Sequence, residues 1–471
     1  MMINYQSYFA KRRSRLKNAA VWITLLAVVA SQQNLRGADW PTYMHDNARS
    51  GVTAEVFDPA QMTEPLWVYT SPAPPQMAWP GPPPFDAGHR RAALAATRDF
   101  DAAFYTTAAG KAVFFGSSVT DGVYCLDGAT GQQRWYYRTD GPVRFAPSYS
   151  AGKVFFGSDD GYVYCVGADS GKLVWKYRAG DEERLVGHDG SLVPFWPVRT
   201  NVAVDGEKVY FSASLVPWRT PYLCALDAAT GADTGAGLYK QEARAPGMES
   251  TYKGSILTPM GATLLSQTKV YLMQGRIAPQ VFDRATGKHL GMLGVPGEGW
   301  AANMSVWAGG GTYALLTPDE RLIHGRGGLW KTGDTLNEFK ADGSRDFVAR
   351  HPSATCMVIA GGRSYTISTV NEIKEQGLII LSQTTLSAVN RNGGKKLWQV
   401  ESDCPYTLIM AGGVLLAGGD EKIVAYHSED GRELWRQEVT GRVRGLTFAN
   451  GRLLVSTDTG HVYAFGEMAG P

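Results

Sequence analysis

The sequence lacks an excess of charge of either sign. Its 471 residues include 46 Lys and Arg against 44 Asp and Glu, which gives a formal net charge of +2. Nucleic-acid-binding domains carry a marked basic excess, so we expect no nucleic-acid partner. Charged residues make up 19% of the chain and apolar residues 44%, a balance typical of a packed globular protein.

Cysteines and catalytic motifs are also scarce. No two of the five cysteines are adjacent, and none stand in C-x-x-C spacing: Cys125, Cys165, Cys224, Cys356 and Cys404. The odd number leaves at least one thiol without an intrachain partner, and neither a zinc site nor an attached haem is indicated. No signature of a catalytic triad, a zinc protease or a P-loop stands out. We therefore predict no catalytic and no metal-binding residues.

The first 38 residues have the pattern of an export signal. Basic residues from Lys11 to Lys17 precede the apolar run Ala19–Ala30. This run has 12 residues, whereas a membrane-spanning helix needs about 20. We predict a signal peptide over 1–38 and a periplasmic or secreted protein. An uncleaved anchor is the alternative, and it would be the one membrane attachment of the chain.

A short unit recurs along the rest of the chain. It combines an apolar strand, a turn of the type Asp-x-x-Thr-Gly and a tryptophan, as in Asp127–Trp135. Trp135 and Trp175 lie 40 residues apart, and Trp398 and Trp435 lie 37 apart. Periods near 40 are typical of four-stranded propeller blades. The sequence thus predicts an all-β propeller.

The number of predicted blades follows from their third strands. We place the ends of these strands at eight positions: Asp127, Gly167, Asp227, Asp283, Gly325, Asn390, His427 and Gly466. The unit at Gly325 is inferred from a long gap, so seven blades are also compatible with the spacing. An outer-strand signature at Trp67 and a third strand ending at Gly466 predict that the two chain ends complete one blade. The propeller would span 39–466, with a tail over 467–471.

Tryptophan and cysteine positions within the repeat favour structural roles. We expect large aromatic rings to dock neighbouring blades at the repeated positions Trp67, Trp135, Trp175, Trp398 and Trp435. Cys125 and Cys165 stand where other repeats have Ala, which indicates buried core positions. Cys356 and Cys404 lie near inner strands of neighbouring repeats, so a disulfide between them is an alternative to free thiols.

Arginines recur where inner strands begin, and inner strands line the central channel of a propeller. Arg144, Arg199 and Arg444 enter such strands, and Arg442 precedes Arg444 by two residues on the same side. Tyr406 has a matching position. Guanidinium groups around one mouth would repel each other, and a carboxylate or phosphate would relieve this. Pairing with local acids, such as Asp181, Glu182, Glu183 or Asp403, is the structural alternative.

Further candidates for this mouth are His351, just upstream of an inner strand, and Trp196. Two insertions start on the same side of the predicted propeller. One is the Pro-rich segment 71–100, which contains Trp79, and the other is 179–197, which contains Trp196. Loops on a rigid scaffold often carry function, although a Pro-rich loop can equally be a passive cover.

The Asp-x-x-Thr-Gly-x-x-x-Trp unit resembles the tryptophan-docking repeat of pyrroloquinoline-quinone (PQQ) dehydrogenases. It is similar as well to that of the non-catalytic propeller lipoprotein of outer-membrane β-barrel assembly. The segment Asp39–Gly51 is similar to the lead-in of exported proteins of this kind. The resemblance covers roughly 39–466, and it implies the fold more than a function. The vicinal Cys-Cys pair typical of the enzymes is missing.

Two functions follow as expectations. The first is an exported, non-catalytic binding or scaffold propeller, a monomer without a cofactor, that engages a small anionic ligand or an exported protein at the channel mouth. The alternative is a PQQ-dependent dehydrogenase that oxidises an alcohol or a sugar with PQQ and calcium, where the arginines would meet the carboxylates of PQQ.

Overall fold

The computed structural model describes most of the chain. The described residues are 37–79, 99–188, 190–215, 219–244, 257–274, 277–293, 311–325, 335–341, 346–373 and 379–466. The predicted signal segment, apart from its last two residues, and the tail 467–471 lie outside them. Among the described residues, no helix combines the length and the apolar character needed to cross a membrane.

Four-stranded antiparallel sheets make up most of the fold. The first three are β3 (Thr106–Ala109), β4 (Ala112–Ser117), β5 (Gly122–Asp127) and β6 (Gln133–Arg138); β7 (Ser148–Ser150), β8 (Lys153–Gly157), β9 (Tyr162–Gly167) and β10 (Leu173–Arg178); and β13 (Ala203–Asp205), β14 (Lys208–Ala213), β15 (Tyr222–Asp227) and β16 (Tyr239–Glu242). The next three are β17 (Thr263–Leu265), β18 (Lys269–Leu272), β19 (Gln280–Asp283) and β20 (His289–Met292); β21 (Tyr313–Leu316), β22 (Arg321–Gly325), β23 (Thr335–Lys340) and β24 (Phe347–Pro352); and β25 (Ala354–Ala360), β26 (Arg363–Ile373), β27 (Ile379–Asn390) and β28 (Lys396–Ser402).

The last sheet has eight strands and joins the two ends of the fold. Its order is β1 (Val52–Thr53), β29 (Thr407–Ala411), β30 (Val414–Gly418), β31 (Asp420–His427), β32 (Glu433–Ala449), β33 (Arg452–Thr457), β34 (His461–Gly466) and β2 (Pro65–Thr70). The long strand β32 pairs first with β31 and then with β33, so the sheet contains two four-stranded groups. Strand β2 pairs antiparallel with β34, and Trp67 lies opposite Ala464.

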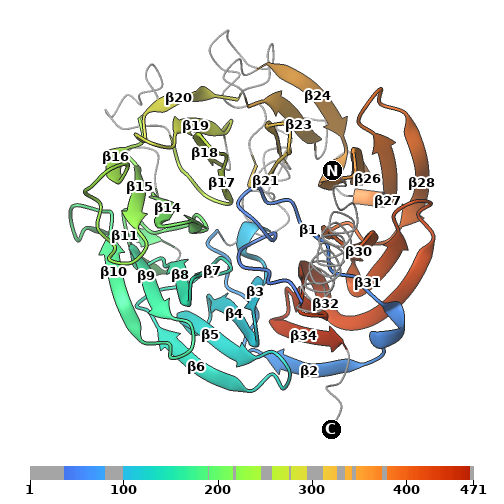
Figure 1. Ribbon diagram of the computed structural model, residues 1–471, viewed down its shortest axis with the longest axis horizontal. Coiled ribbons are helices and arrows are strands. Elements are labelled where there is room, and N and C mark those ends of the chain that lie inside the picture. Colours follow the sequence, from blue (N-terminus) through green and yellow to red (C-terminus); the bar gives the residue numbers. More distant parts are fainter. Residues whose placement is uncertain are drawn as a thin grey trace, which may run out of the picture. The chain divides into compact units, whose positions relative to one another are not determined.

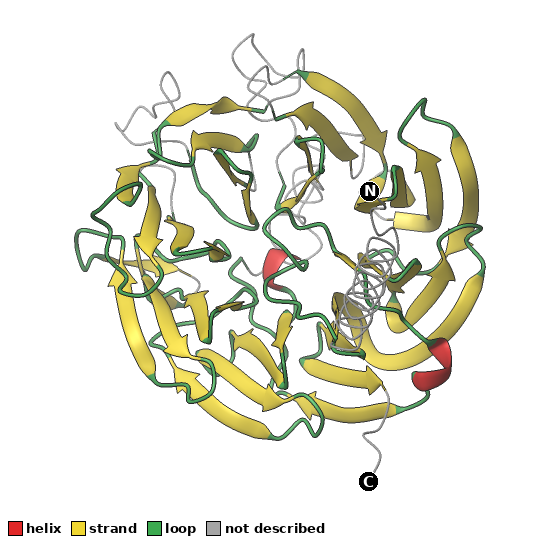
Figure 2. Cartoon of the chain, in the orientation of Figure 1, coloured by secondary structure: helices red, strands yellow, loops and turns green. Residues whose placement is uncertain are grey.

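These sheets stand around a common centre as the blades of a propeller (Figure 1). Figure 2 shows that strands account for nearly all regular structure, beside two short 3₁₀ helices, η2 (Pro59–Gln61) and η3 (Asp99–Asp101). The all-β propeller predicted from the sequence is confirmed. Counting the eight-stranded sheet as two, the described strands form eight four-stranded groups.

The strand assignment near Gly325 is wrong. We took it as the end of a third strand, but Gly325 ends β22, which is a second strand. The third strand of that blade is β23, which carries neither the Asp-x-x-Thr-Gly turn nor the tryptophan of the regular repeats. Without that signature, the spacing alone could not assign the strand.

The Asp-Thr-Gly turn is held by its own side chains. Asp127 Oδ1 accepts hydrogen bonds from the backbone of Ala129 and Thr130 at 3.0 and 3.1 Å. Gly131 N donates to the Asp127 carbonyl at 2.8 Å, and Gly131 has a φ of +69°. The same pattern recurs around Asp227 and Gly231. A left-handed glycine at this point closes the turn at little cost.

The repeat tryptophans dock each blade onto the next. Each of the five donates its indole N–H to a backbone carbonyl of the following blade: Trp67 to Gly128 at 3.0 Å, Trp135 to Ala168 at 2.7 Å, Trp175 to Ala228 at 3.2 Å, Trp398 to Ser428 at 3.0 Å and Trp435 to Met62 at 2.8 Å. The rings of the first four lie on the turn glycines Gly131, Gly171, Gly231 and Gly431. In the last case, Met62 from the N-terminal region supplies the carbonyl.

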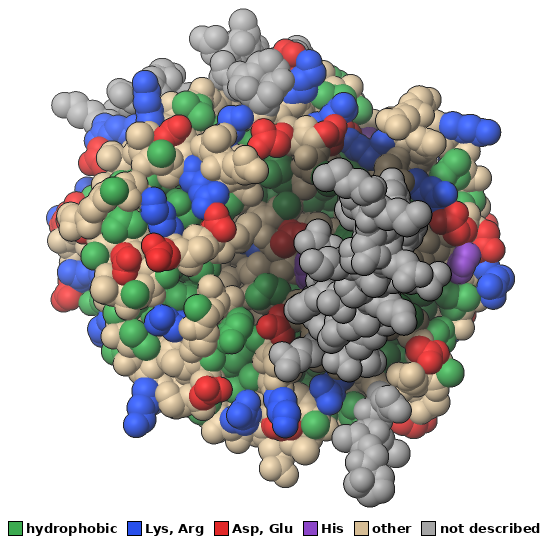
Figure 3. Space-filling model, in the orientation of Figure 1, with side chains coloured by type: hydrophobic (Ala, Val, Ile, Leu, Met, Phe, Trp, Pro, Cys, Tyr) green, Lys and Arg blue, Asp and Glu red, His purple; other side chains and the backbone are tan. Residues whose placement is uncertain are grey.

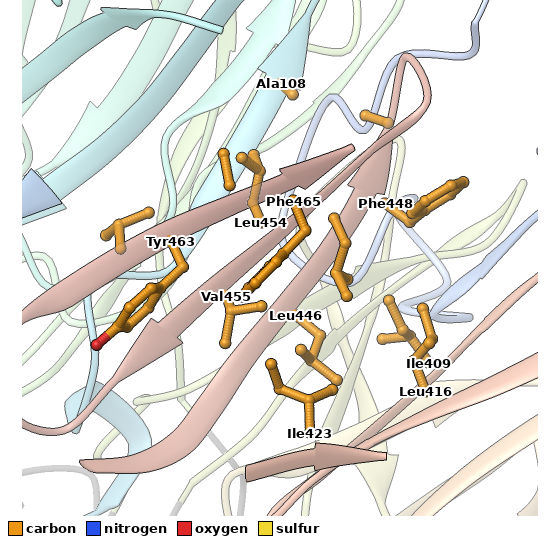
Figure 4. Close-up of a cluster of buried hydrophobic side chains, with 14 of the residues drawn as sticks. Ala108, Ile409, Leu416, Ile423, Leu446, Phe448, Leu454, Val455, Tyr463 and Phe465 are labelled. Atoms are coloured by element: carbon orange, nitrogen blue, oxygen red, sulfur yellow. The ribbon is translucent and has the colours of Figure 1, made fainter. Parts of the chain in front are cut away.

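The apolar core lies between neighbouring blades. One cluster, drawn in Figure 4, joins β3 with the blades of β29 to β34. The labelled members are Ala108, Ile409, Leu416, Ile423, Leu446, Phe448, Leu454, Val455, Tyr463 and Phe465. Strands buried on both faces explain the nearly continuous apolar runs of the inner strands.

The segment 39–53, which we call the N-terminal strap, crosses the centre of the propeller (Figure 1). The backbone of the strap forms hydrogen bonds with five inner strands. The bonded pairs are Trp40 with Ala108, Pro41 with Tyr149, Asn47 with Leu265, Ala48 with Leu316 and Gly51 with Met410. Arg49 is fully buried and donates to the carbonyls of Tyr43, Asp46 and Thr263 and to the Thr42 hydroxyl. Burial lowers the pKa of Arg49 to about 10.

A glycine substitution tests the docking of the tryptophans. A Cβ at Gly231 would lie 2.7 Å from the Trp175 ring, whereas a Cβ at Gly206 meets no atom within 4 Å. Both glycines have a positive φ, so the backbone strain is matched. We expect Gly231→Ala to lower stability by about 1–3 kcal/mol more than Gly206→Ala, because it adds a clash in the core. Equal melting temperatures would contradict the role of the ring.

Removal of the N-terminal region tests the pairing of the chain ends. A 71–471 chain loses β2, the Trp67 ring and the Met62 carbonyl that Trp435 uses, and it loses the N-terminal strap as well. We expect a loss of at least roughly 3–5 kcal/mol, the value for deletion of a large buried side chain. Thermal unfolding against a 39–471 control measures it, and an unchanged melting temperature would show that the pairing contributes nothing.

Candidate functional site at the channel rim

Two of the predicted arginines form a buried ion network where inner strands begin. Arg144 donates to Asp159 at 2.8 Å and to Asp101 at 2.6 Å. Arg199 binds the same Asp159 with Nε at 3.0 Å and Nη2 at 2.9 Å. Asp159 thus links the arginine that precedes β7 with the arginine that precedes β13. The structure brings Arg144 and Arg199 together, as the sequence predicted.

For these two arginines, the structure shows the structural alternative, pairing with acids, although with other acids than those named. Two buried carboxylates, Asp101 and Asp159, face the two guanidinium groups and counter their charge. The acids that we named as local partners pair elsewhere: Asp181 with Lys240, Glu182 with Arg184, Glu183 with Arg178, and Asp403 with Lys422 and Arg436. Asp159 stands in the turn between β8 and β9, and Asp101 is distant in sequence.

The two described stems of the Pro-rich insertion, 71–79 and 99–101, cover this network. Asp101 Oδ2 accepts a hydrogen bond from Ala78 N at 2.7 Å, which clips the stems together. Arg144 also donates to the Gln76 carbonyl at 2.6 Å. The Arg199 guanidinium lies 5.4 Å from the centroid of the Trp79 ring. Arg199 is therefore only 1% exposed.

A buried cluster of side chains lies next to this cover. Phe100 of η3 stacks on Phe145, with centroids 5.4 Å apart, in a buried cluster with Ala78 and Met260. From the strap, Tyr43 meets Tyr105 and Phe145 edge-on at 5.2 and 6.0 Å. The strap and the insertion thus meet in the middle.

Arg444 lies apart from this network. Its guanidinium stacks over the ring of Tyr406, 4.3 Å from the centroid, which joins two of the predicted residues. Arg442 is exposed and faces Asp420 and Asp458 at 3.7 and 3.9 Å. A register shift between Val443 and Gly445 separates the two arginines, so our prediction that they share one side of the strand is wrong.

His351 and Trp196 also have other surroundings than predicted. His351 lies on the outer strand β24 and pairs with Glu338 at 3.2 Å, because β24 extends to Pro352 and the next inner strand begins only at Ala354. Trp196 is buried, packs in the core cluster that contains Val198 and donates to the Thr220 carbonyl at 3.0 Å. Both side chains are therefore engaged in packing or ion pairs.

Sequence reasoning missed Glu338 and Tyr239 as blade connections. Glu338 is nearly buried and binds Arg391 of the next blade at 2.7 Å and Arg321 at 3.2 Å. Burial opposes this charge, but His351 and Arg391 lower the pKa of Glu338 to about 2. Tyr239 lies on Gly287 where other blades have tryptophan. The spacing to the turn glycine could have identified Tyr239, whereas the Glu338 contacts have no signal in the sequence.

All five cysteines are buried, and none forms a disulfide in the described part of the chain. The alternative of a Cys356–Cys404 disulfide is wrong, since Cys356 Sγ contacts the Tyr406 carbonyl at 3.3 Å. Burial raises the pKa of Cys125 and of Cys165 to about 12, which leaves the reactive thiolate scarce. Among the described residues, no three His, Cys, Asp or Glu side chains are grouped to hold a metal ion.

The pKa values of the two carboxyl groups of the network are shifted in opposite directions. For Asp159, burial raises the pKa, but Arg144 and Arg199 outweigh it and hold the pKa below its ordinary value. For Asp101, burial prevails over Arg144 and raises the pKa. The network therefore keeps Asp159 ionised and makes Asp101 the carboxyl that takes up a proton first.

Opposite pH dependences of stability follow from these shifts. Ionised Asp159 stabilises the fold above the pKa that Asp159 has in the unfolded chain, and this contribution is lost as pH falls through its pKa in the folded chain. Protonated Asp101 stabilises the fold below its unfolded pKa, and this contribution is lost as pH rises through its pKa in the folded chain. Melting temperatures between about pH 3 and pH 7 should show the wild-type advantage over Asp159→Asn growing with pH, and that over Asp101→Asn shrinking. Asp159→Asn should cost about 3–5 kcal/mol near neutral pH, because it breaks a buried pair. If the melting temperatures of the two variants changed with pH in parallel, the assignment of opposite pKa shifts to Asp159 and Asp101 would be refuted.

The tryptophan-docked blades and the filled channel define a propeller of the PQQ-repeat class. The chain belongs to the family described as "Outer membrane protein assembly factor BamB", whose model matches residues 76–234 and 382–470.

Individual relatives are more distant. Tetrathionate hydrolase of Acidithiobacillus ferrooxidans is 23% identical over 211 residues, which span 43% of this chain and 35% of that protein. The fold is similar to that of quinohemoprotein alcohol dehydrogenase from Comamonas testosteroni, with a TM-score of 0.61, 14% identity and coverage of 92% of this chain and 81% of that one. A europium-containing methanol dehydrogenase has a TM-score of 0.58 and 12% identity, over 91% and 98% of the two chains. These likenesses show the fold alone.

Proposed function

We propose that this chain is an exported, non-catalytic binding propeller that engages its ligand or partner protein at the rim where the inner strands begin. The observation that carries the proposal is the fixed cover on this rim. Asp101 and Arg144 tie both described stems of the Pro-rich insertion to the blades, so these stems are a fixed part of the rim. Recognition loops on a rigid scaffold have this character.

The second insertion adds a surface on the same side. Its strands β11 (Leu185–His188) and β12 (Ser191–Pro194) form a separate two-stranded sheet. Leu192 is 71% exposed and Leu185 53%. An isolated two-stranded hairpin is marginally stable in water, and exposed apolar side chains favour contact with another protein.

The surface charge supports a protein or small-molecule partner over nucleic acid. On the face drawn in Figure 3, basic and acidic side chains are intermingled. No single-sign patch is visible there among the coloured residues, in keeping with the net charge of +2. Export rests on the sequence pattern of 1–38 and on the family.

The dehydrogenase alternative implies a quinone and calcium, and the described residues at this rim do not fit them. Arg144 and Arg199 already bind carboxylates, and Phe100, Phe145 and Tyr43 occupy the centre. The carboxylates of the network are engaged by arginines, which leaves few oxygen ligands for a calcium ion. We therefore derive no reaction step through the quinone.

Site-specific photo-crosslinking in the native host tests the proposal. A photoreactive residue at Leu192 should give a discrete protein adduct, whereas one at Val56, which is equally exposed beside the strap, should give none. The proposal is wrong if the two positions give the same adducts. It is also wrong if PQQ and calcium confer dye-linked alcohol or sugar dehydrogenase activity on the purified chain.

A further inference from the structure

The network at the rim forms a closed ring of contacts. Asp101 binds Arg144, Arg144 binds Asp159, and Asp159 binds Arg199. The ring closes through the insertion, because Arg199 lies on Trp79 and the preceding Ala78 donates its N–H back to Asp101. Residues from three separate segments thus form one ring of contacts.

Two polar atoms of this ring are buried without a hydrogen-bond partner in the described part of the chain: Arg199 Nη1 and Asp101 Oδ1. Arg199 uses its other two nitrogens on Asp159, and Asp101 uses its other oxygen on Arg144 and Ala78. Both residues are 1% exposed. An unsatisfied buried polar group is unfavourable, and more so when it is charged, which favours a bound group at these atoms.

The protonation state of Asp101 determines which kind of ligand the ring can bind. Arg144 binds Asp101 directly, and Arg199 acts on it through its charge. Asp159 follows beyond Arg144, and Asp121 interacts with Arg144 from the β4–β5 turn. The other neighbours, such as Phe100, are apolar. When every group is ionised, the positive charges of the two arginines cancel the negative charges of the two carboxylates of the ring. With Asp101 protonated, the ring is cationic, and both open atoms can donate a hydrogen bond.

We propose that the ring binds one oxygen of a small monovalent carboxylate, which enters together with a proton on Asp101. Arg199 Nη1 and the Asp101 hydroxyl donate to this oxygen, and its charge replaces that of the Asp101 carboxylate. The inference rests on the proposed function, in which the rim engages an anionic ligand. It adds the chemical class of that ligand and its regulation by pH.

Calorimetric titration of the full chain with formate, from about pH 4 to about pH 8, tests the site. Because one proton accompanies each anion, the affinity should fall by up to about tenfold per pH unit above the titration of Asp101. Asp101→Asn keeps an amide donor at the open position at every pH, so its formate affinity should not change with pH. This variant separates the proposal from simple loss of a carboxylate.

Two further variants provide the controls. Arg199→Lys keeps a charge for Asp159 but removes the open donor, and formate affinity should fall at least about tenfold. Arg178→Ala removes an exposed ion pair with Glu183 and should change nothing. Melting temperatures confirm that each variant is folded.

Three results would overturn the inference: formate binding that does not depend on pH in the wild type, equal binding by Arg199→Lys, or a formate-soaked crystal with water or nothing in the ring. The adducts formed at Leu192 do not depend on this ring. They would therefore survive failure of the anion site, which keeps the two proposals separable.

Discussion

The contact between a tryptophan and the turn glycine of the next blade is the interaction on which the structure depends. Each blade alone leaves two apolar faces exposed, and it becomes stable only against its neighbours. The indole ring buries a large area and fixes the spacing of the blades, while its N–H satisfies a carbonyl that the turn leaves free. The turn needs glycine twice, for its positive φ and for the close approach of the ring.

Where this unit degenerates, other chemistry replaces it. Tyr239 keeps the ring, and its hydroxyl donates to the Arg284 carbonyl, which has the repeat position of the carbonyls that the tryptophans use. Between the β21–β24 and β25–β28 blades, the buried Glu338 and Arg391 make the connection. An ion pair of this kind has a large desolvation cost, and it requires a nearly ideal geometry to be stable. The propeller therefore tolerates irregular repeats only where specific polar contacts compensate.

The centre of the molecule follows a different principle. The strap and the insertion meet at one side chain, Phe145. Tyr43 of the strap contacts its ring, and Phe100 next to the insertion stacks on it. Buried charges accompany both, Arg49 in the strap and Asp101 in the insertion. A buried charge is stable only when its polar atoms have hydrogen-bond partners. The unpartnered atoms Asp101 Oδ1 and Arg199 Nη1 therefore distinguish this network from an ordinary salt bridge.

The sequence by itself determined the repeat, the docking role of residues such as Trp135 and the place of Arg144 and Arg199 just before inner strands. These features depend on local spacing, and local spacing is directly visible in a chain. Only the tertiary structure decided that Asp101 and Asp159 neutralise the arginines, that His351 pairs with Glu338 and that the strap crosses the channel. Such contacts join residues tens to hundreds of positions apart, and which charges meet is set by how the blades close on each other.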